Sequence, residues 1–199
     1  MFLTGSPIIR GITALTRRAS GRALHTAQVT MAPIKVGDKL PVADLFEDSP
    51  ANKISVCDLT AGKKVVLFAV PGAFTPGCSK THLPGYIENA AKMKAEGIDE
   101  IVCVAVNDPY VMAAWGAVHN TKGKIRMLAD PSGNFIKALE LGVNLPPLGG
   151  LRAKRFSMVI NDSTVEQLNV EPDGTGLSCS LANRLKVKNA SVPARDINN

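Results

Sequence analysis

Short apolar runs alternate with helix-length amphipathic stretches along most of this chain. The first strong run, Val65–Val70, is rich in valine and stops at Pro71-Gly72, a pattern typical of a buried strand. Residues 34–60 mix apolar and turn residues and predict one or two strands at the N-terminal edge of a sheet. Further strands are expected over Lys63–Val70, Glu100–Val106, Lys124–Ala129, Arg155–Asn161 and Thr164–Val170, the last two forming a hairpin around Asp162-Ser163.

Helical spacing predicts four helices between and after these strands. Their expected ranges are Thr75 or Gly77 to Glu96, Pro109 to about Asn120, Ser132 or Asn134 to Leu141, and Leu177 to Lys186. Asp108 is the expected N-cap of the second helix, with Pro109 in its first turn. Pro84 lies early in the first helix and should kink or break it. The stretches 142–151 and 174–176, rich in proline or glycine, are expected to be loops.

Alternating strands and helices followed by a hairpin predict an α/β fold, with a central mixed β-sheet flanked by helices. The chain has no internal repeat or linker, so one domain is expected over residues 32–186, followed by a polar C-terminal tail over residues 187–199. No apolar run approaches the roughly 20 residues that a membrane helix needs, and no membrane association is expected.

The net charge of +6 comes largely from the first 30 residues, which hold four arginines and no acidic residue. This composition is typical of a mitochondrial transit peptide, although a disordered basic tail would have the same composition. Met31 follows directly and could start a second, cytoplasmic form. Without the four arginines the 23 basic residues fall to 19 against 17 acidic ones, so nucleic-acid binding is not expected.

Four cysteines occur, and their spacing fits neither a zinc site nor a structural disulfide framework. Cys103 lies in an apolar strand pattern and Cys57 in an edge-strand pattern, so both are expected to be structural. Cys78 and Cys179 lie among glycine, serine and threonine, in stretches expected to be accessible and able to move. Cys78 also falls where a strand ends and a helix begins, and the helix dipole there favours a thiolate.

A helix terminus alone is too weak to ionise Cys78 near neutral pH. It contributes at most about 2 kcal/mol, whereas about 3.4 kcal/mol is needed. A cation or further hydrogen bonds must supply the rest. Thr75 can donate a hydroxyl, and Arg155, at the start of a strand, is a better candidate cation than the flexible Lys80. Arg155 could equally belong to a solvated basic run.

Two other functions remain open from the residues alone. His82 follows Cys78 by four positions, so Cys78 with His82 or His119 could form the dyad of a cysteine hydrolase. Alternatively, the chain could be a redox-inert binding module with an ordinary thiol at this position.

The stretch Pro71-GAF-Thr75-PG-Cys78 resembles the Pro-x-x-x-Thr-x-x-Cys signature of the peroxiredoxins, and the longer PGAFTPGCSKTHLPGY resembles their type-5 branch. Similarity extends from about Ala32 to Leu181 through several separate motifs. The resemblance implies a thioredoxin-like fold and a peroxidase that reduces hydrogen peroxide, organic hydroperoxides and peroxynitrite. It also implies roles in antioxidant defence, redox homeostasis and peroxide signalling.

Carried onto this chain, the resemblance makes Cys78 the peroxidatic cysteine, shielded by Pro71, and gives Thr75 and Arg155 the task of holding the thiolate and the peroxide. Cys179 matches the resolving cysteine that forms a disulfide within the same chain. Thioredoxin is the implied reductant, no metal, flavin or haem is needed, and a monomer or weak homodimer is expected. Beyond Leu181 the sequence departs from the family pattern and lacks a peroxisomal signal.

Overall fold

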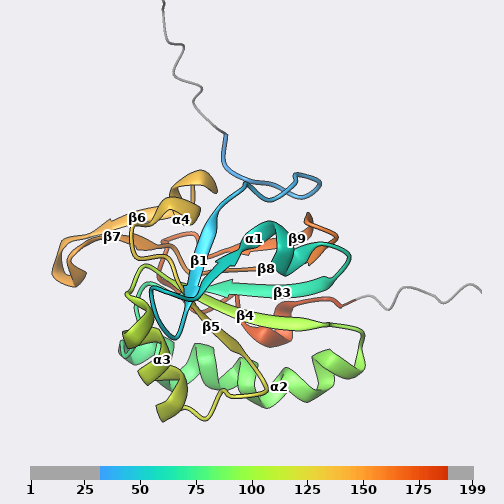
Figure 1. Cartoon of the computed structure of the whole chain (residues 1–199), viewed down its shortest axis with the longest axis horizontal. Helices are drawn as coiled ribbons and strands as arrows, with labels where there is room; N and C mark the ends of the chain where they lie inside the picture. Colours follow the sequence, from blue (N-terminus) through green and yellow to red (C-terminus); the bar gives the residue numbers. More distant parts are fainter. Residues whose placement is uncertain (1–31, 188–199) are drawn as a thin grey trace, which may run out of the picture. The chain divides into compact units, whose positions relative to one another are not determined.

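A seven-stranded mixed sheet forms the centre of the computed structural model, which describes residues 32–187 (Figure 1). Its strand order is β2-β1-β5-β4-β3-β8-β9, with β3, β4 and β5 parallel and the other pairs antiparallel. The strands are β1 (Asp44–Glu47), β2 (Lys53–Ser55), β3 (Lys64–Ala69), β4 (Glu100–Ala105), β5 (Arg126–Ala129), β8 (Phe156–Asn161) and β9 (Thr164–Val170). The predicted α/β fold with a mixed sheet is therefore confirmed.

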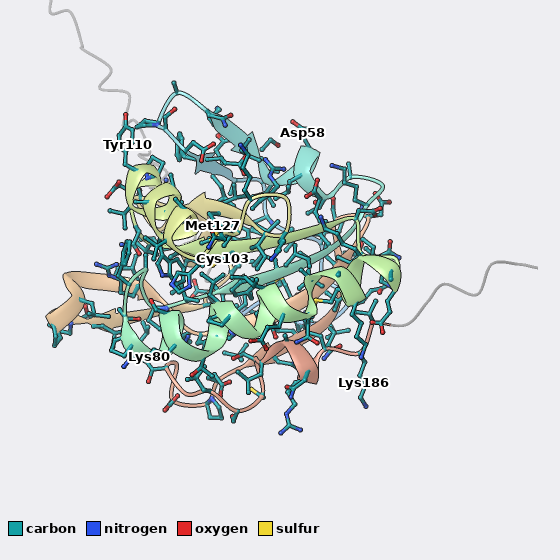
Figure 2. All side chains as sticks on the ribbon, turned by 90° about the horizontal axis from the view of Figure 1, so that it is seen from below. Asp58, Lys80, Cys103, Tyr110, Met127 and Lys186 are labelled. Atoms are coloured by element: carbon teal, nitrogen blue, oxygen red, sulfur yellow. The ribbon has the colours of Figure 1, made fainter. Side chains whose placement is uncertain are left out.

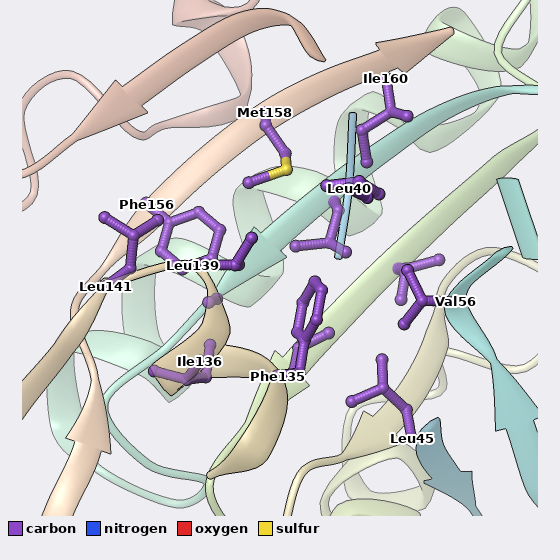
Figure 3. Close-up of a cluster of buried hydrophobic side chains, with 14 of the residues drawn as sticks. Leu40, Leu45, Val56, Phe135, Ile136, Leu139, Leu141, Phe156, Met158 and Ile160 are labelled. Carbon is purple, nitrogen blue, oxygen red and sulfur yellow. The ribbon is translucent and has the colours of Figure 1, made fainter. Parts of the chain in front are cut away.

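Alternate residues of the central strands face opposite sides of the sheet, and each side carries a hydrophobic core. On one side, β3 and β8 contribute Val65, Leu67, Met158 and Ile160 to a core shared with helices α1 (Val56–Thr60) and α4 (Asn134–Ala138). Figure 3 shows side chains of this core, with Phe135 and Ile136 of α4 facing the sheet. Asp130 holds the start of α4 by accepting hydrogen bonds from the N–H groups of Asn134 and Ile136.

The other side of the sheet is covered by helices α2 (Leu83–Ala95) and α3 (Pro109–Val118). Its core includes Phe68, Cys78 and Cys103, all fully buried; Figure 2 labels Cys103 near the middle of the molecule. Asp108 caps α3 by accepting a hydrogen bond from the N–H of Val111, as predicted. This side therefore carries the cysteine that the sequence marks for chemistry.

Two sequence predictions are wrong: the loop predicted over residues 142–151 and the edge strand predicted at Cys57. Residues 142–151, expected to be a loop, form a separate hairpin of β6 (Gly142–Leu145) and β7 (Gly150–Ala153) around a 3₁₀ turn, η2 (Pro146–Leu148). Pro146, Pro147 and Gly149 belong to its turn, where Gly149 has φ 91°. Cys57 lies in helix α1 rather than in an edge strand, because Ser55 caps the helix by accepting from the N–H of Asp58.

The C-terminal segment is also not the predicted helix over Leu177–Lys186. It contains bends and a single 3₁₀ turn, η3 (Ala182–Arg184), which lies beside α2 in Figure 1. The N–H groups of Ser178, Cys179 and Ser180 donate to the Glu171 carboxylate instead of to helical carbonyls. Side-chain capture of three consecutive donors therefore replaces the helix.

No helix within residues 32–187 is long and apolar enough to cross a bilayer. The expected transit peptide over residues 1–30 and nearly all of the expected tail over residues 187–199 lie outside the described residues.

Candidate active site

Cys78 begins a π-helical turn, η1 (Cys78–His82), that connects the loop after β3 to α2. The N–H of Leu83 donates to the carbonyl of Cys78, five residues back, which is the spacing of a π-helix. Pro84, in the first turn of α2, has no N–H to continue the pattern. The irregularity expected early in this helix takes the form of the wide turn before Pro84, and α2 continues unbroken through Pro84 itself.

Arg155 lies directly against Cys78, although the two residues are 77 positions apart in the sequence. The pairing of β3 with β8 sets Phe156 opposite Ala69, so Arg155 sits at the edge of the sheet where the Cys78 loop leaves it. The Nη1 atom of Arg155 is 3.4 Å from the Cys78 Sγ atom, and its Nε donates to the carbonyl of Thr175 at 3.1 Å. Arg155 is 4% exposed, so this cation is held in a nearly dry site.

Cys78 is fully buried, which corrects the expectation that its stretch is accessible. The chain packs closely around it: a Cβ atom on Gly77 would lie 3.3 Å from Arg155 Nη2 and 3.4 Å from Leu177 Cδ1. Glycine at position 77 therefore leaves the room that the guanidinium occupies. The sulfur is shielded from bulk water, and a substrate must be small or must displace part of this covering.

Pro71 and Thr75 lie in the loop between β3 and Cys78. Pro71 is buried, and the Thr75 hydroxyl donates to the carbonyl of Gly72 at 2.9 Å. With its hydrogen directed at this carbonyl, the Thr75 oxygen is left as an acceptor. The N–H of Ala73 donates to the side chain of Asn107, which ties the loop to the end of β4.

His82 is buried beside Arg155 and serves a different purpose from the predicted dyad. Its Nδ1 atom is 3.3 Å from Arg155 Nη1, and its Nε2 atom is 3.1 Å from the carbonyl of Ser180. Arginine can only donate, so Nδ1 accepts and Nε2 carries the proton. Burial is the main cause that lowers the pKa of His82 to about 4, with a smaller contribution from Arg155. A neutral imidazole with both nitrogens occupied is not arranged as a base for Cys78.

This buried histidine predicts a loss of stability in mild acid. His82 takes up a proton near pH 6.5 in the unfolded chain but only near pH 4 in the fold, so the unfolded state binds more protons in this window. The unfolding free energy should fall by about 3 kcal/mol between these pH values. Urea unfolding of the native protein and of His82→Gln would check this: the variant should lose less stability on acidification. Parallel pH curves would contradict the assignment.

Cys179 lies in the C-terminal segment, half buried, and its thiol donates to the carbonyl of Val170 at 3.3 Å. Burial, followed by the negative charge of Glu171, raises the pKa of the Cys179 thiol. Cys78 and Cys179 are both free thiols in this structure. The Cys78 sulfur contacts Arg155, and the Cys179 thiol contacts the Val170 carbonyl.

Cys103 faces the same core as Cys78 but has no polar role there. It is fully buried in β4, and burial raises the pKa of its thiol well above the usual range. Within the described part of the chain, no group of three or more histidine, cysteine, aspartate or glutamate residues is arranged to hold a metal ion.

Sequence reasoning missed the role of two site residues. Glu171, which gathers the donors of the Cys179 segment, stands in a loop-like stretch, and only the serine-rich run seven residues later hints at its partners. The sequence predicts Tyr86 only as part of a helix, whereas its hydroxyl donates to the carbonyl of Ser180 at 2.7 Å. Both residues fix the segment that carries Cys179.

The sheet order, the covering helices and a buried thiol beside a guanidinium define an α/β protein with a thioredoxin-like fold and a thiol centre. Residues 35–185 match the model of the redoxin family. Peroxiredoxin-2B from Arabidopsis thaliana is 45% identical over 148 residues, which cover 72% of this chain and 91% of that protein.

Solved structures agree with these sequence matches. Reduced Prx3 from Vibrio vulnificus in complex with hydrogen peroxide has a TM-score of 0.71 and 47% identity, over 76% of this chain and 96% of that one. Peroxiredoxin 5 from Alvinella pompejana has a TM-score of 0.67 and 44% identity, over 74% and 96% of the two chains. The chain belongs to the peroxiredoxins, within the redoxin family, and is a peroxidase of the oxidoreductase class.

Proposed function

We propose that the protein reduces hydrogen peroxide, organic hydroperoxides and peroxynitrite, with Cys78 as the peroxidatic cysteine and Cys179 as the resolving cysteine. The observation that best supports this function is the 3.4 Å contact between the Arg155 guanidinium and the Cys78 sulfur in a buried site. No ion pair within residues 32–187 involves Arg155. A buried cation without a carboxylate is best compensated by a thiolate on Cys78.

In the first step, the Cys78 thiolate attacks one oxygen of the peroxide. A sulfur–oxygen bond forms, the oxygen–oxygen bond breaks, and its electron pair leaves on hydroxide or alkoxide, which takes up a proton, or on nitrite where the substrate is peroxynitrite. Arg155 stabilises the negative charge that develops on the oxygens. The Thr75 oxygen accepts a hydrogen bond from the peroxide O–H, and Pro71 keeps water away from the sulfur. Cys78 ends this step as a sulfenic acid.

In the second step, the Cys179 sulfur attacks the oxidised Cys78 sulfur. A sulfur–sulfur bond forms, the sulfur–oxygen bond breaks, and hydroxide leaves as water. The two cysteines are free and the Cys179 thiol donates to the Val170 carbonyl, so Cys179 must leave this carbonyl for the disulfide to form. Thioredoxin, an external dithiol, then reduces the disulfide by exchange. This scheme uses no metal, flavin or haem.

The proposed domain organisation follows the composition of the chain. Residues 1–30 are proposed as a mitochondrial transit peptide, residues 32–186 as the peroxidase domain and residues 187–199 as a polar tail. Translation from Met31 would give a cytoplasmic form. The protein is proposed to act as a monomer or weak homodimer.

The function is tested by replacing Arg155 with lysine in a thioredoxin-coupled assay. Lysine keeps the charge but cannot contact Cys78, His82 and Thr175 together as the guanidinium does. We expect NADPH oxidation with hydrogen peroxide to slow by about 10²–10³-fold, the usual effect of losing one such donor. The matched control is Arg126→Lys. Arg126 lies on β5 and is paired with Glu47 of β1, so this variant should keep the native rate.

An Arg155→Lys protein that is folded and as fast as the native one would contradict this role of Arg155. A native protein that reduces peroxide with other thiols but not with thioredoxin would contradict the proposed reductant.

A further inference from the structure

One carboxylate, that of Glu171, gathers the whole segment around Cys179. The N–H groups of Ser178, Cys179 and Ser180 donate to its Oε1 atom at 2.8, 3.0 and 2.9 Å. The hydroxyls of Ser178 and Ser180 donate to the same carboxylate at 2.6 and 2.7 Å. Five donors from three consecutive residues therefore converge on one side chain.

Glu171 is itself firmly placed and charged. Its N–H donates to the carbonyl of Arg155 at 3.0 Å, its carbonyl accepts from Gly174 at 2.9 Å, and the residue is 1% exposed. Burial on its own would raise the pKa of Glu171, but the hydrogen bonds from Ser178 and Ser180 outweigh it and lower the value to about 2. The five hydrogen bonds are thus charge-assisted, which makes each about twice as strong as a neutral one.

These bonds restrict the movement of Cys179 in particular. Its own N–H is one of the five donors. Cys179 therefore cannot move away from the Val170 carbonyl without breaking its hydrogen bond to Glu171. The nearby charge of Glu171 also keeps the Cys179 sulfur protonated, because burial and this charge both raise its pKa. Both effects slow the attack of Cys179 on another sulfur.

We propose that Glu171 is a positioning residue for the resolving step: its carboxylate holds residues 178–180 in the reduced arrangement, and their release from it limits the rate at which the Cys78–Cys179 disulfide forms. This inference rests on the proposed function, in which Cys179 resolves the sulfenic acid of Cys78. The time that Cys78 spends as a sulfenic acid is then set by Glu171.

A second anchor holds the same segment independently of Glu171. The carbonyl of Ser180 accepts from both His82 Nε2 and the Tyr86 hydroxyl, and Gln167 accepts from the N–H of Lys186. Because these contacts remain when Glu171 is changed, the segment should stay folded in a conservative variant. Glu171→Gln keeps the shape of the side chain, removes its charge and replaces one acceptor oxygen with an NH2 group that can only donate.

Rapid quenching followed by intact-mass analysis of Glu171→Gln tests the inference. The rate constants of Cys78 oxidation and of disulfide formation are measured in one time course, with hydrogen peroxide as the probe. We expect the ratio of the second constant to the first to rise about tenfold over the native ratio. With excess peroxide, less of the variant should carry two added oxygens, because its sulfenic acid is consumed sooner.

Two further variants sharpen the test. Ser180→Ala removes one of the five donors and should raise the ratio by a smaller factor. Glu166→Gln makes the same change on β9, at a carboxylate that contacts Lys64 and Asn161, and should leave the ratio at its native value.

A Glu171→Gln protein that is folded and has the native ratio, or a lower one, would overturn the inference, since Glu171 would then not restrain Cys179. If the native protein gains one oxygen and never forms the disulfide, the proposed function fails as well. The native time course therefore separates the two failures.

Discussion

Replacing Cys78 with serine is expected to abolish thioredoxin-coupled reduction of peroxide. A serine hydroxyl does not ionise at neutral pH and cannot take up an oxygen atom from a peroxide, so neither the nucleophile nor the sulfenic acid exists. The fully buried site would otherwise change little, because the two side chains differ by one atom. NADPH oxidation in the presence of thioredoxin, thioredoxin reductase and hydrogen peroxide measures the effect.

The control for this variant is Cys57→Ser. Cys57 lies in α1, a helix that covers the opposite side of the sheet from Cys78, and its replacement should keep the native rate. Full thioredoxin-coupled activity in Cys78→Ser would rule out the proposed chemistry.

Replacing Cys179 with serine is expected to leave a single turnover and to stop cycling. The contact between Arg155 and Cys78 does not involve Cys179, so the first oxidation of Cys78 should proceed. Without the second thiol no intramolecular disulfide can form for thioredoxin to reduce. Peroxide consumption should therefore stop after about one equivalent per protein chain, while the native protein continues for as long as NADPH lasts.

A steady thioredoxin-coupled rate in Cys179→Ser, equal to the native one, would show that resolution does not need this residue. Cys103→Ser is the matched control, because Cys103 is a buried cysteine on the same side of the sheet as Cys78 and has no part in the scheme.

Much of the fold could be predicted because its central strands are local apolar runs with clear ends. The apolar run Val65–Val70 predicts the strand that the structure shows as β3. The hairpin predicted at Asp162-Ser163 is also present, and both residues of its turn adopt positive φ, as a tight hairpin turn requires. Proline and glycine were less reliable guides. They marked residues 142–151 as a loop, although only the turn of that hairpin depends on them.

The C-terminal segment could not be predicted because its conformation depends on a distant acceptor. Local spacing favoured a helix over Leu177–Lys186, and nothing in the segment itself reveals that Glu171 takes its backbone donors. Tertiary hydrogen bonds to a charged group here outweigh helix propensity.

The candidate site was predictable in its residue types and not in its geometry. Sequence placed Cys78 where a strand ends and named Arg155 as a candidate cation, but only the pairing of β3 with β8 brings the two together. The sequence offers His82 as a possible dyad partner of Cys78, whereas the structure pairs it with Arg155. Arg155 and the Ser180 carbonyl occupy both ring nitrogens of His82, so the imidazole cannot act as the base. These contacts join residues far apart in the sequence and could not be read from it.

The mass of the native protein after one equivalent of hydrogen peroxide tests the central claim most directly. If Cys78 is oxidised and Cys179 resolves it within the same chain, the reduced protein should lose two hydrogens, and peptide mapping should join the two cysteines. A gain of one oxygen with no disulfide, or an unchanged mass, would contradict the account.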